Sequence, residues 1–148
     1  MEEIKPTEGI ISTNCNIGYL PQDPQINNNQ TLAEFLSDIN IKILKYLKIE
    51  YLDFERPLES LSGGEKTKII LAKILSAKPD YLIMDEPTNN LDEQSRQIIY
   101  QLIKEWKNGL LIISHDRKIL ELVDQIFEMT KKGIKIYEDH NSSNIDPD

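Results

Sequence analysis

The chain has 148 residues, and its 17 Lys and Arg against 25 Asp and Glu give a formal net charge of −8. That length is one domain or part of one. The acidic balance and the lack of any basic block argue against direct nucleic-acid binding by this chain alone, because phosphate contacts need clustered Lys and Arg. No apolar run approaches the ~18 residues of a membrane span. The acidic N-terminus is not a signal peptide, and the single cysteine, Cys15, excludes an internal disulfide, so we expect a cytoplasmic protein.

The first third of the chain predicts two strands and a helix. Residues 9–12 and 17–20 are short apolar runs of strand length, and the second ends at Pro21-Gln22-Asp23-Pro24. Residues 31–48 carry apolar side chains at helical spacing, with Thr31 and Glu34 in the positions of a capping box. Asn40 lies inside this pattern and could break or divide the helix. Residues 49–60 then return through a loop.

The middle of the chain has the strongest pattern. Ser62-Gly63-Gly64-Glu65 predicts a loop that opens a helix, with Ser62 as its cap and Glu65 completing a capping box. This helix runs from about 62 to 77, and Lys78-Pro79 stops it. A short apolar strand, residues 81–84, follows and ends in two adjacent carboxylates, Asp85 and Glu86.

The last third alternates in the same way. We expect a helix over residues 93–107 that Asp92 caps and Gly109 ends, and then a buried strand over 110–113. Asp116 caps a short helix that reaches Val123. Residues 125–130 and 133–138 predict a hairpin. Residues 139–148 are polar and predict a disordered end.

Strands that alternate with helices predict an α/β fold with a mostly parallel sheet flanked by helices and a C-terminal β-hairpin. The carboxyl ends of strands are where such sheets place ligands, so Asp85 and Glu86 stand at the expected site. One carboxylate can hold Mg²⁺, and the next can deprotonate an attacking water. The glycine pair exposes backbone at a helix N-terminus, which suits a phosphate group. Each feature alone has a bland explanation, a turn or a solvated strand end, but their spacing favours nucleotide chemistry.

These stretches together resemble the ATP-binding cassette (ABC) ATPases. Residues 61–65 resemble the signature loop, residues 81–86 the Walker B strand, Leu91-Asp92 the D-loop and Ser114-His115-Asp116 the H-switch. The resemblance covers about residues 18–137. The sequences EKTK, DEPTNNLD and SHDR are most similar to the ABC-F branch. The resemblance implies one partial ATP-binding domain over residues 1–138, with a helical subdomain over about 31–77.

The resemblance also implies roles for individual residues. Glu86 would be the general base for ATP hydrolysis, and His115 would stabilise the γ-phosphate. Gln22 resembles the Q-loop glutamine and would contact Mg²⁺ and the attacking water, while Asp85 would complete the Mg²⁺ shell. A last group of residues would act across a dimer with a facing cassette. Ser62, Gly63 and Gly64 would contact the ATP bound on that cassette, and Asp92 would touch the cassette itself.

A phosphate loop of the form Gly-x-x-x-x-Gly-Lys-Ser/Thr is absent from the sequence, since no two of its glycines have that spacing before a lysine. In the family this loop lies upstream, with a strand of the sheet, so we expect a truncated cassette. Such a chain should bind ATP weakly, hydrolyse it very slowly alone and leave apolar sheet surface uncovered.

Several functions remain open at this point. The chain could be an ATP hydrolase that works only with the missing upstream half, and the intact ABC-F family acts on ribosomes. It could instead be a non-catalytic module that closes over ATP on another cassette, or a decayed gene fragment. The ATPase component of an ABC transporter is a further alternative.

Overall fold

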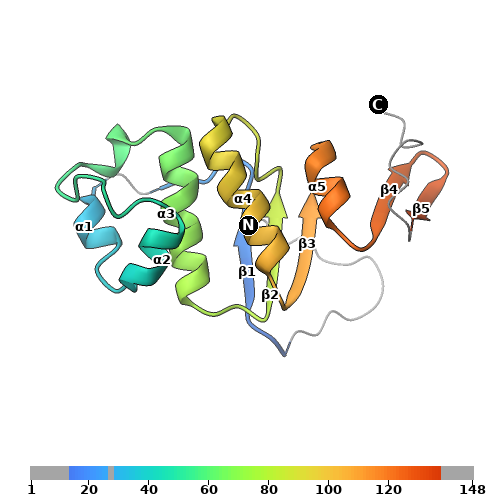
Figure 1. Ribbon diagram of the computed structural model, residues 1–148, viewed down its shortest axis with the longest axis horizontal. Helices are drawn as coiled ribbons and strands as arrows, with labels where there is room; N and C mark the ends of the chain where they lie inside the picture. The colour runs from blue at the N-terminus through green and yellow to red at the C-terminus, as the bar shows by residue number, and fades with distance from the viewer. Residues whose placement is uncertain (1–13, 27–28, 138–148) are drawn as a thin grey trace.

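The computed structural model describes residues 14–26 and 29–137. Figure 1 shows the elements from the N-terminus in blue to the C-terminus in red. The elements follow the predicted alternation and have these bounds: β1 Ile17–Leu20, α1 Leu32–Phe35, α2 Ile41–Tyr46, a 3₁₀ turn Leu58–Ser60, α3 Gly63–Ser76, β2 Tyr81–Asp85, α4 Glu93–Glu105, β3 Gly109–Ile113, α5 Arg117–Leu122, β4 Ile126–Thr130 and β5 Gly133–Tyr137.

The centre of the molecule is a parallel sheet with the strand order β1-β2-β3. Leu20 pairs with Met84, and Asp85 pairs with Ile113, so all three strands end at the same edge. The hairpin β4-β5 forms a separate antiparallel sheet. The α/β fold with a parallel sheet, flanking helices and a C-terminal hairpin is therefore confirmed. The strand predicted at residues 9–12 and the end predicted at 139–148 lie outside the described residues.

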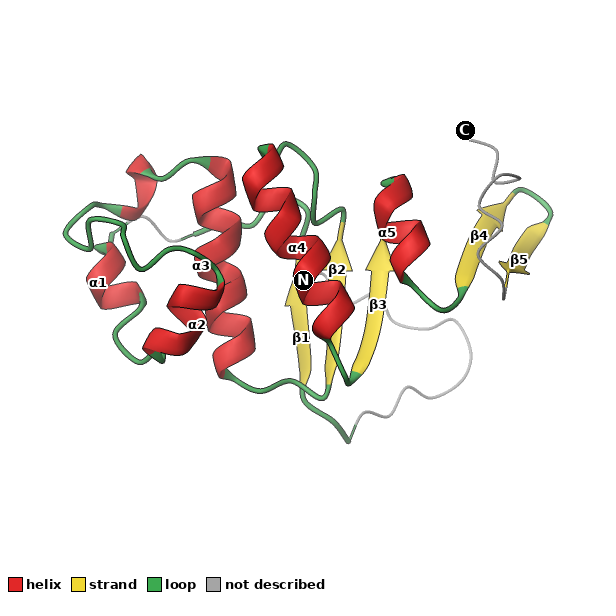
Figure 2. Ribbon diagram, in the orientation of Figure 1, coloured by secondary structure: helices red, strands yellow, loops and turns green. Residues whose placement is uncertain are grey.

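Helices α3 and α4 pack against one face of the sheet, and α1 and α2 lie beyond α3 at one end of the molecule, opposite the hairpin (Figure 2). Leu20, Leu82 and Met84 point into this packed face and are fully buried. They join one continuous apolar cluster with side chains from α3, α4 and the loops around α1 and α2. No helix within the described residues is long and apolar enough to cross a bilayer.

The other face of the sheet remains exposed. Because side chains alternate along a strand, the odd-numbered residues share this face. They are large and apolar, with exposed fractions between 36% and 54%: Ile17, Tyr19, Tyr81, Leu111 and Ile113. Parallel sheets normally have both faces covered, so this face is an uncovered apolar surface of the described residues.

The helix predicted over residues 31–48 is two short helices, α1 and α2. Asn40 divides it, because its side chain accepts a hydrogen bond from the Lys42 N–H and caps α2. The capping box of Thr31 and Glu34 is present at the start of α1. Backbone bonds from Leu32 to Arg56 and from Ala33 to Phe54 tie α1 to the following loop. These bonds satisfy N–H groups in the first turn of α1, which have no partner within the helix.

The signature helix α3 and helix α4 begin at the predicted positions, but α4 ends earlier than predicted. Ser62 and Glu65 form the predicted capping box of α3. Asp92 occupies the N-cap position of α4, but its carboxylate makes no capping hydrogen bond. Gly109 does not end α4, which stops at Glu105; it is the first residue of β3. The Tyr81 ring covers Gly109 so closely that a Cβ there would lie 2.0 Å from a ring carbon.

Candidate active site

The candidate active site lies where β2 and β3 end side by side. The pairing of Asp85 with Ile113 places Glu86, the next residue, beside the segment that carries His115. The Glu86 backbone N–H donates to the Ile113 carbonyl over 2.8 Å, which extends the strand pairing past the end of β2. The structure therefore brings the predicted base and the predicted phosphate-facing histidine together.

Glu86 and His115 contact each other directly. His115 Nε2 lies 3.5 Å from Glu86 Oε1, and the two form an ion pair when the imidazole is protonated. The glutamate side chain is only 14% exposed, whereas the histidine side chain is 85% exposed. A carboxylate at the carboxyl end of the strands can accept a proton from a bound water. An accessible imidazole beside it can at the same time face the reacting group.

Glu86 has a φ of +45°, in the left-handed region that residues other than glycine rarely adopt. Such strain clusters at functional sites, where the surrounding structure holds it in place. Here the bond to the Ile113 carbonyl holds the Glu86 backbone. The strained backbone turns the chain away from the strand direction immediately after Asp85.

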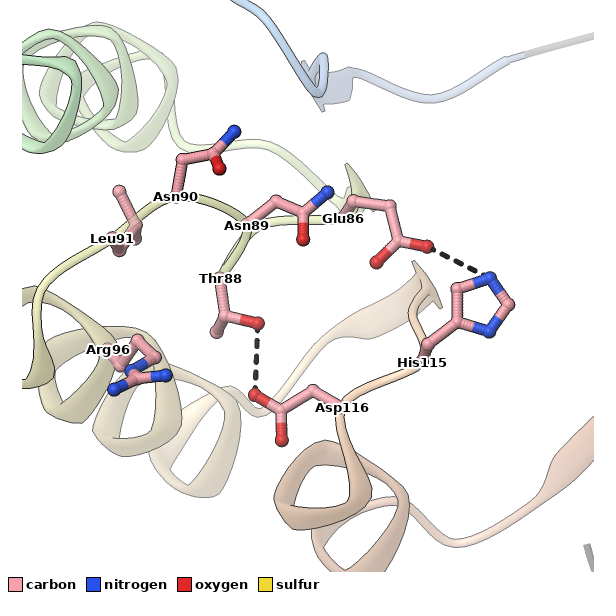
Figure 3. Close-up of a pocket in the computed structure, with 8 residues that line it drawn as sticks. All are labelled: Glu86, Thr88, Asn89, Asn90, Leu91, Arg96, His115 and Asp116. Atoms are coloured by element: carbon pink, nitrogen blue, oxygen red, sulfur yellow. Dashed lines mark hydrogen bonds and ion pairs between the residues drawn. The ribbon is translucent and has the colours of Figure 1, made fainter. Parts of the chain in front are cut away.

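A shallow pocket opens beside this pair (Figure 3). Its walls come from the segment after β2, from the first turns of α4 and from the segment after β3. Within the described residues, the Nε of Arg96 is buried without a hydrogen-bond partner. The lining residues are Glu86, Thr88, Asn89, Asn90, Leu91, Arg96, His115 and Asp116.

A hydrogen-bonded cluster at the base of this pocket was not predicted from the sequence. The Thr88 hydroxyl donates to Asp116 Oδ2 over 2.9 Å, and the Tyr100 hydroxyl donates to the same oxygen over 2.6 Å. Burial alone would raise the pKa of Asp116, but the bonds from Tyr100 and Thr88 outweigh it and hold that pKa below its ordinary value. Asp116 is therefore a carboxylate at neutral pH. The sequence indicated Asp116 only as part of the stretch that resembles the H-switch and as a helix cap, and its bond from the Lys118 N–H confirms the cap.

Three other predicted residues lie outside the pocket wall. Gln22 is exposed in the segment after β1, and Asp85, the last residue of β2, is partly buried. Asp92 lies at the start of α4, where the Ser95 hydroxyl lowers the pKa of the Asp92 carboxyl. Asp92 also lies against the signature helix, since a Cβ on Gly64 would be 3.5 Å from its Oδ1.

The signature residues form a site of their own at the start of α3. The Glu65 N–H donates to the Ser62 hydroxyl, and the Ser62 N–H donates to Glu65 Oε1. A Cβ on Gly63 would meet nothing within 4 Å, whereas one on Gly64 would lie 3.1 Å from Ser95 Oγ. Gly63 therefore presents open backbone to the exterior, and Gly64 packs against α4. Ser62, Gly63 and Gly64 do not line the pocket beside Glu86.

The residues expected to hold Mg²⁺ supply oxygen ligands only. Within residues 14–26 and 29–137 there is no cluster of three His, Cys, Asp or Glu side chains that would enclose a metal ion. Mg²⁺ in nucleotide sites usually takes one or two protein carboxylates together with waters and phosphates. One carboxylate from Asp85 and one amide oxygen from Gln22 fit that donor set, and they do not fit a protein-only metal cage.

Relatives with similar sequences include proteins that are named as ATP-binding proteins. The chain is 32% identical over 146 residues to the probable ATP-binding protein YbiT of Escherichia coli O157:H7, covering 89% of this chain and 28% of that protein. It is 27% identical over 191 residues to the energy-dependent translational throttle protein EttA of Mycobacterium tuberculosis, covering 96% of this chain and 34% of that protein. It is 40% identical over 128 residues to the zinc import ATP-binding protein ZnuC of Buchnera aphidicola, covering 76% of this chain and 53% of that protein.

Solved structures of cassette proteins have the same fold. A putative metal-chelate type ABC transporter in an inward-facing conformation matches with a TM-score of 0.72 at 22% identity, over 93% of this chain and 64% of that chain. An archaeal ribosome recycling factor, aABCE1, in complex with the ribosomal stalk protein aP1, matches with a TM-score of 0.70 at 28% identity, over 84% and 27%. The chain thus spans about a third or less of relatives such as YbiT and EttA.

The fold and the paired strand ends define an α/β domain of the ABC ATPase type. The family model described as ABC transporter matches residues 1–89, which is more than half of the chain. The chain belongs to this family, whose ATP-binding domains generally bind ATP with Mg²⁺ and work as dimers with a partner cassette.

Proposed function

We propose that this chain carries the water-activating side of an ATP hydrolysis site. The observation that supports this most directly is the 3.5 Å contact between His115 Nε2 and Glu86 Oε1 at the ends of two neighbouring strands. Glu86 combines partial burial with a strained backbone, and His115 is accessible. Packing does not require the strained backbone of Glu86 or the exposed imidazole of His115. The first suits a base, and the second suits a group that faces a phosphate.

In the proposed mechanism, Glu86 accepts a proton from the water that attacks the γ-phosphate. His115 stabilises the negative charge that develops on the phosphate oxygens. Asp85 and Gln22 are the residues that would hold Mg²⁺, which supplies charge neutralisation to the phosphates when bound. Gln22 also orients the attacking water from the segment after β1.

The phosphates themselves need groups that this sequence lacks. Because it contains no phosphate loop, the chain is expected to bind ATP weakly alone and to need a polypeptide that supplies the loop. Ser62, Gly63 and Gly64 are proposed to contact ATP held by a facing cassette, and Asp92 to touch that cassette. The open backbone at Gly63 supports this role, because nothing within the described residues occupies the space beside it.

The finer assignment we propose is the ABC-F branch, on the EKTK, DEPTNNLD and SHDR sequences. The name of EttA describes an action on translation, and aABCE1 is described as a ribosome recycling factor. By this proposal the whole protein would act on ribosomes. A transporter ATPase is the second candidate, which the 40% identity to ZnuC supports.

Nucleotide binding by the purified chain, alone and mixed with an intact cassette such as YbiT, tests the proposal. Alone, the chain should bind Mg-ATP weakly, and Glu86→Gln should change its near-zero turnover little. In the mixture, hydrolysis above that of YbiT alone should fall about 100-fold with Glu86→Gln, the range of a lost general base. Glu121→Gln, on the exposed side of α5, is the matched control and should have no effect. Tight Mg-ATP binding by the chain alone would overturn the need for a partner. Equal hydrolysis rates for Glu86→Gln and the parent in the mixture would overturn the role of Glu86.

A further inference from the structure

Asp116 joins three segments that are far apart in the sequence. Its Oδ2 accepts one hydrogen bond from Thr88, in the segment after β2, and another from Tyr100, in the middle of α4. Its Oδ1 accepts a third bond from the Lys118 N–H, at the start of α5. The Asp116 N–H in turn donates to the Ser114 hydroxyl over 3.0 Å. One carboxylate therefore fixes the relative positions of these segments.

Packing alone does not require these polar groups. Thr88 and Tyr100 are 9% and 7% exposed, so valine and phenylalanine of nearly the same shape would fill the same space. Burying two hydroxyls against a carboxylate is favourable only when every group is paired, as it is here. Hydrogen bonds to an ionised acceptor are short and directional, and the 2.6 Å bond from Tyr100 is in that range.

The cluster lies directly beside the candidate catalytic pair. Thr88 follows Glu86 by two residues, and Asp116 follows His115 immediately. The His115 side chain is 85% exposed, so packing around its own ring does little to hold it. The distance between His115 and Glu86 then depends on how the two backbone segments are held, and the Thr88–Asp116 hydrogen bond joins these segments (Figure 3).

We propose that Asp116 is a positioning residue that, through Thr88 and Tyr100, holds His115 in place against Glu86. The inference rests on the proposed function only in that Glu86 and His115 act together on ATP. The geometry itself can be measured without nucleotide. A failure of ATP binding would therefore leave this test intact, and a failure of this test would leave the ATP assays unaffected.

The experiment follows the imidazole signals of the full chain by carbon–proton NMR at one fixed pH, without nucleotide. The chain has two histidines, His115 and His140, and a His115→Gln variant assigns them. Thr88→Val and Tyr100→Phe should each move the His115 signal by more than its line width or broaden it. Thr88→Ser, which restores the hydroxyl, should return the signal to within half of the shift. The His140 signal serves as the internal reference.

Thr67→Val is the matched control, because Thr67 is also a buried threonine and, among the described residues, its hydroxyl bonds only to the Gly63 carbonyl on its own helix. It should leave the His115 signal in place. Thermal unfolding of each variant separates lost stability from lost positioning. An unchanged His115 signal in Thr88→Val would overturn the proposal even if the melting temperature fell. If Tyr100→Phe does not fold, the Val and Ser variants at position 88 decide the matter alone.

Discussion

Single residues in this chain show how the site is held. Glu86 keeps a φ of +45°, which costs of the order of 1–3 kcal/mol for a residue with a side chain. The bond from its N–H to the Ile113 carbonyl offsets part of that cost. The two signature glycines differ in their surroundings. A Cβ on Gly63 would meet nothing within 4 Å, whereas a Cβ on Gly64 would lie close to Ser95.

Replacement of each signature glycine by alanine should affect stability differently. Gly63→Ala adds a Cβ into open space and reduces the freedom of the unfolded chain, so it should stabilise the fold by up to about 0.5–1 kcal/mol. Gly64→Ala places a Cβ 3.1 Å from the buried Ser95 hydroxyl, so it should be less stable than Gly63→Ala by about 1 kcal/mol or more. Urea unfolding measures both, and equal stabilities would show that α4 gives way without cost.

The hydroxyl of Tyr100 should give the stability a specific dependence on alkaline pH. Burial and the hydrogen bond to Asp116 raise the pKa of Tyr100 from 10.0 to about 12. The unfolded chain ionises this tyrosine first, so stability that is fully present below pH 10 is lost as the pH rises toward 12. Tyr100→Phe should lose less stability between pH 9 and 11 than the parent does, in denaturant titrations at each pH. Tyr51→Phe, at a tyrosine that is 69% exposed, controls for the loss of a phenol; a parent-like slope in Tyr100→Phe would contradict the prediction.

Whole elements were predicted best where local chemistry determines them. The start of α3 follows from Ser62 and Glu65, which form a local capping box, and β2 from its apolar run. Asn40 indicated the division of residues 31–48, because its side chain can cap a second helix, as it does for α2. The cluster of Thr88, Tyr100 and Asp116 could not be predicted, since its members are 16 and 28 residues apart in sequence. The positions of Glu86 and His115 at strand ends, by contrast, followed from the apolar runs that precede them.

The capping box of α3 should be the most sensitive point of that helix. Ser62→Ala removes the acceptor for the Glu65 N–H and should lower the free energy of unfolding by about 1 kcal/mol. Ser76→Ala, at the other end of α3, is the matched control: within the described part of the chain its hydroxyl bonds only to the Lys73 carbonyl, and alanine is the better helix former. It should be neutral or slightly stabilising. Chemical denaturation gives both values, and equal losses would mean that the box adds nothing.

At the scale of the whole molecule, the uncovered face of the sheet is the main departure from an ordinary α/β domain. Its exposed side chains come from all three strands. The hairpin adds a second exposed apolar set on cross-strand neighbours, since Phe127 pairs with Ile136 and Met129 pairs with Ile134. The expected loss of an upstream strand predicts uncovered apolar surface on the sheet. The exposed hairpin surface could not be predicted, because the alternation of apolar and polar residues along a strand does not tell which face is packed.

These two surfaces should bind an apolar fluorescent dye independently. Exposed contiguous apolar surface is uncommon on soluble domains and is what such dyes detect. Replacing Leu111 and Ile113 by threonine keeps β-propensity and removes apolar surface that is 54% and 53% exposed. Dye fluorescence should fall, and the fall should add to that from Met129→Thr with Ile134→Thr, because the two sets lie in separate sheets. Lys104→Thr, on α4, should leave the fluorescence unchanged. Unaltered dye binding in the Leu111 and Ile113 variant, with unfolding still cooperative, would show that this face is covered in solution.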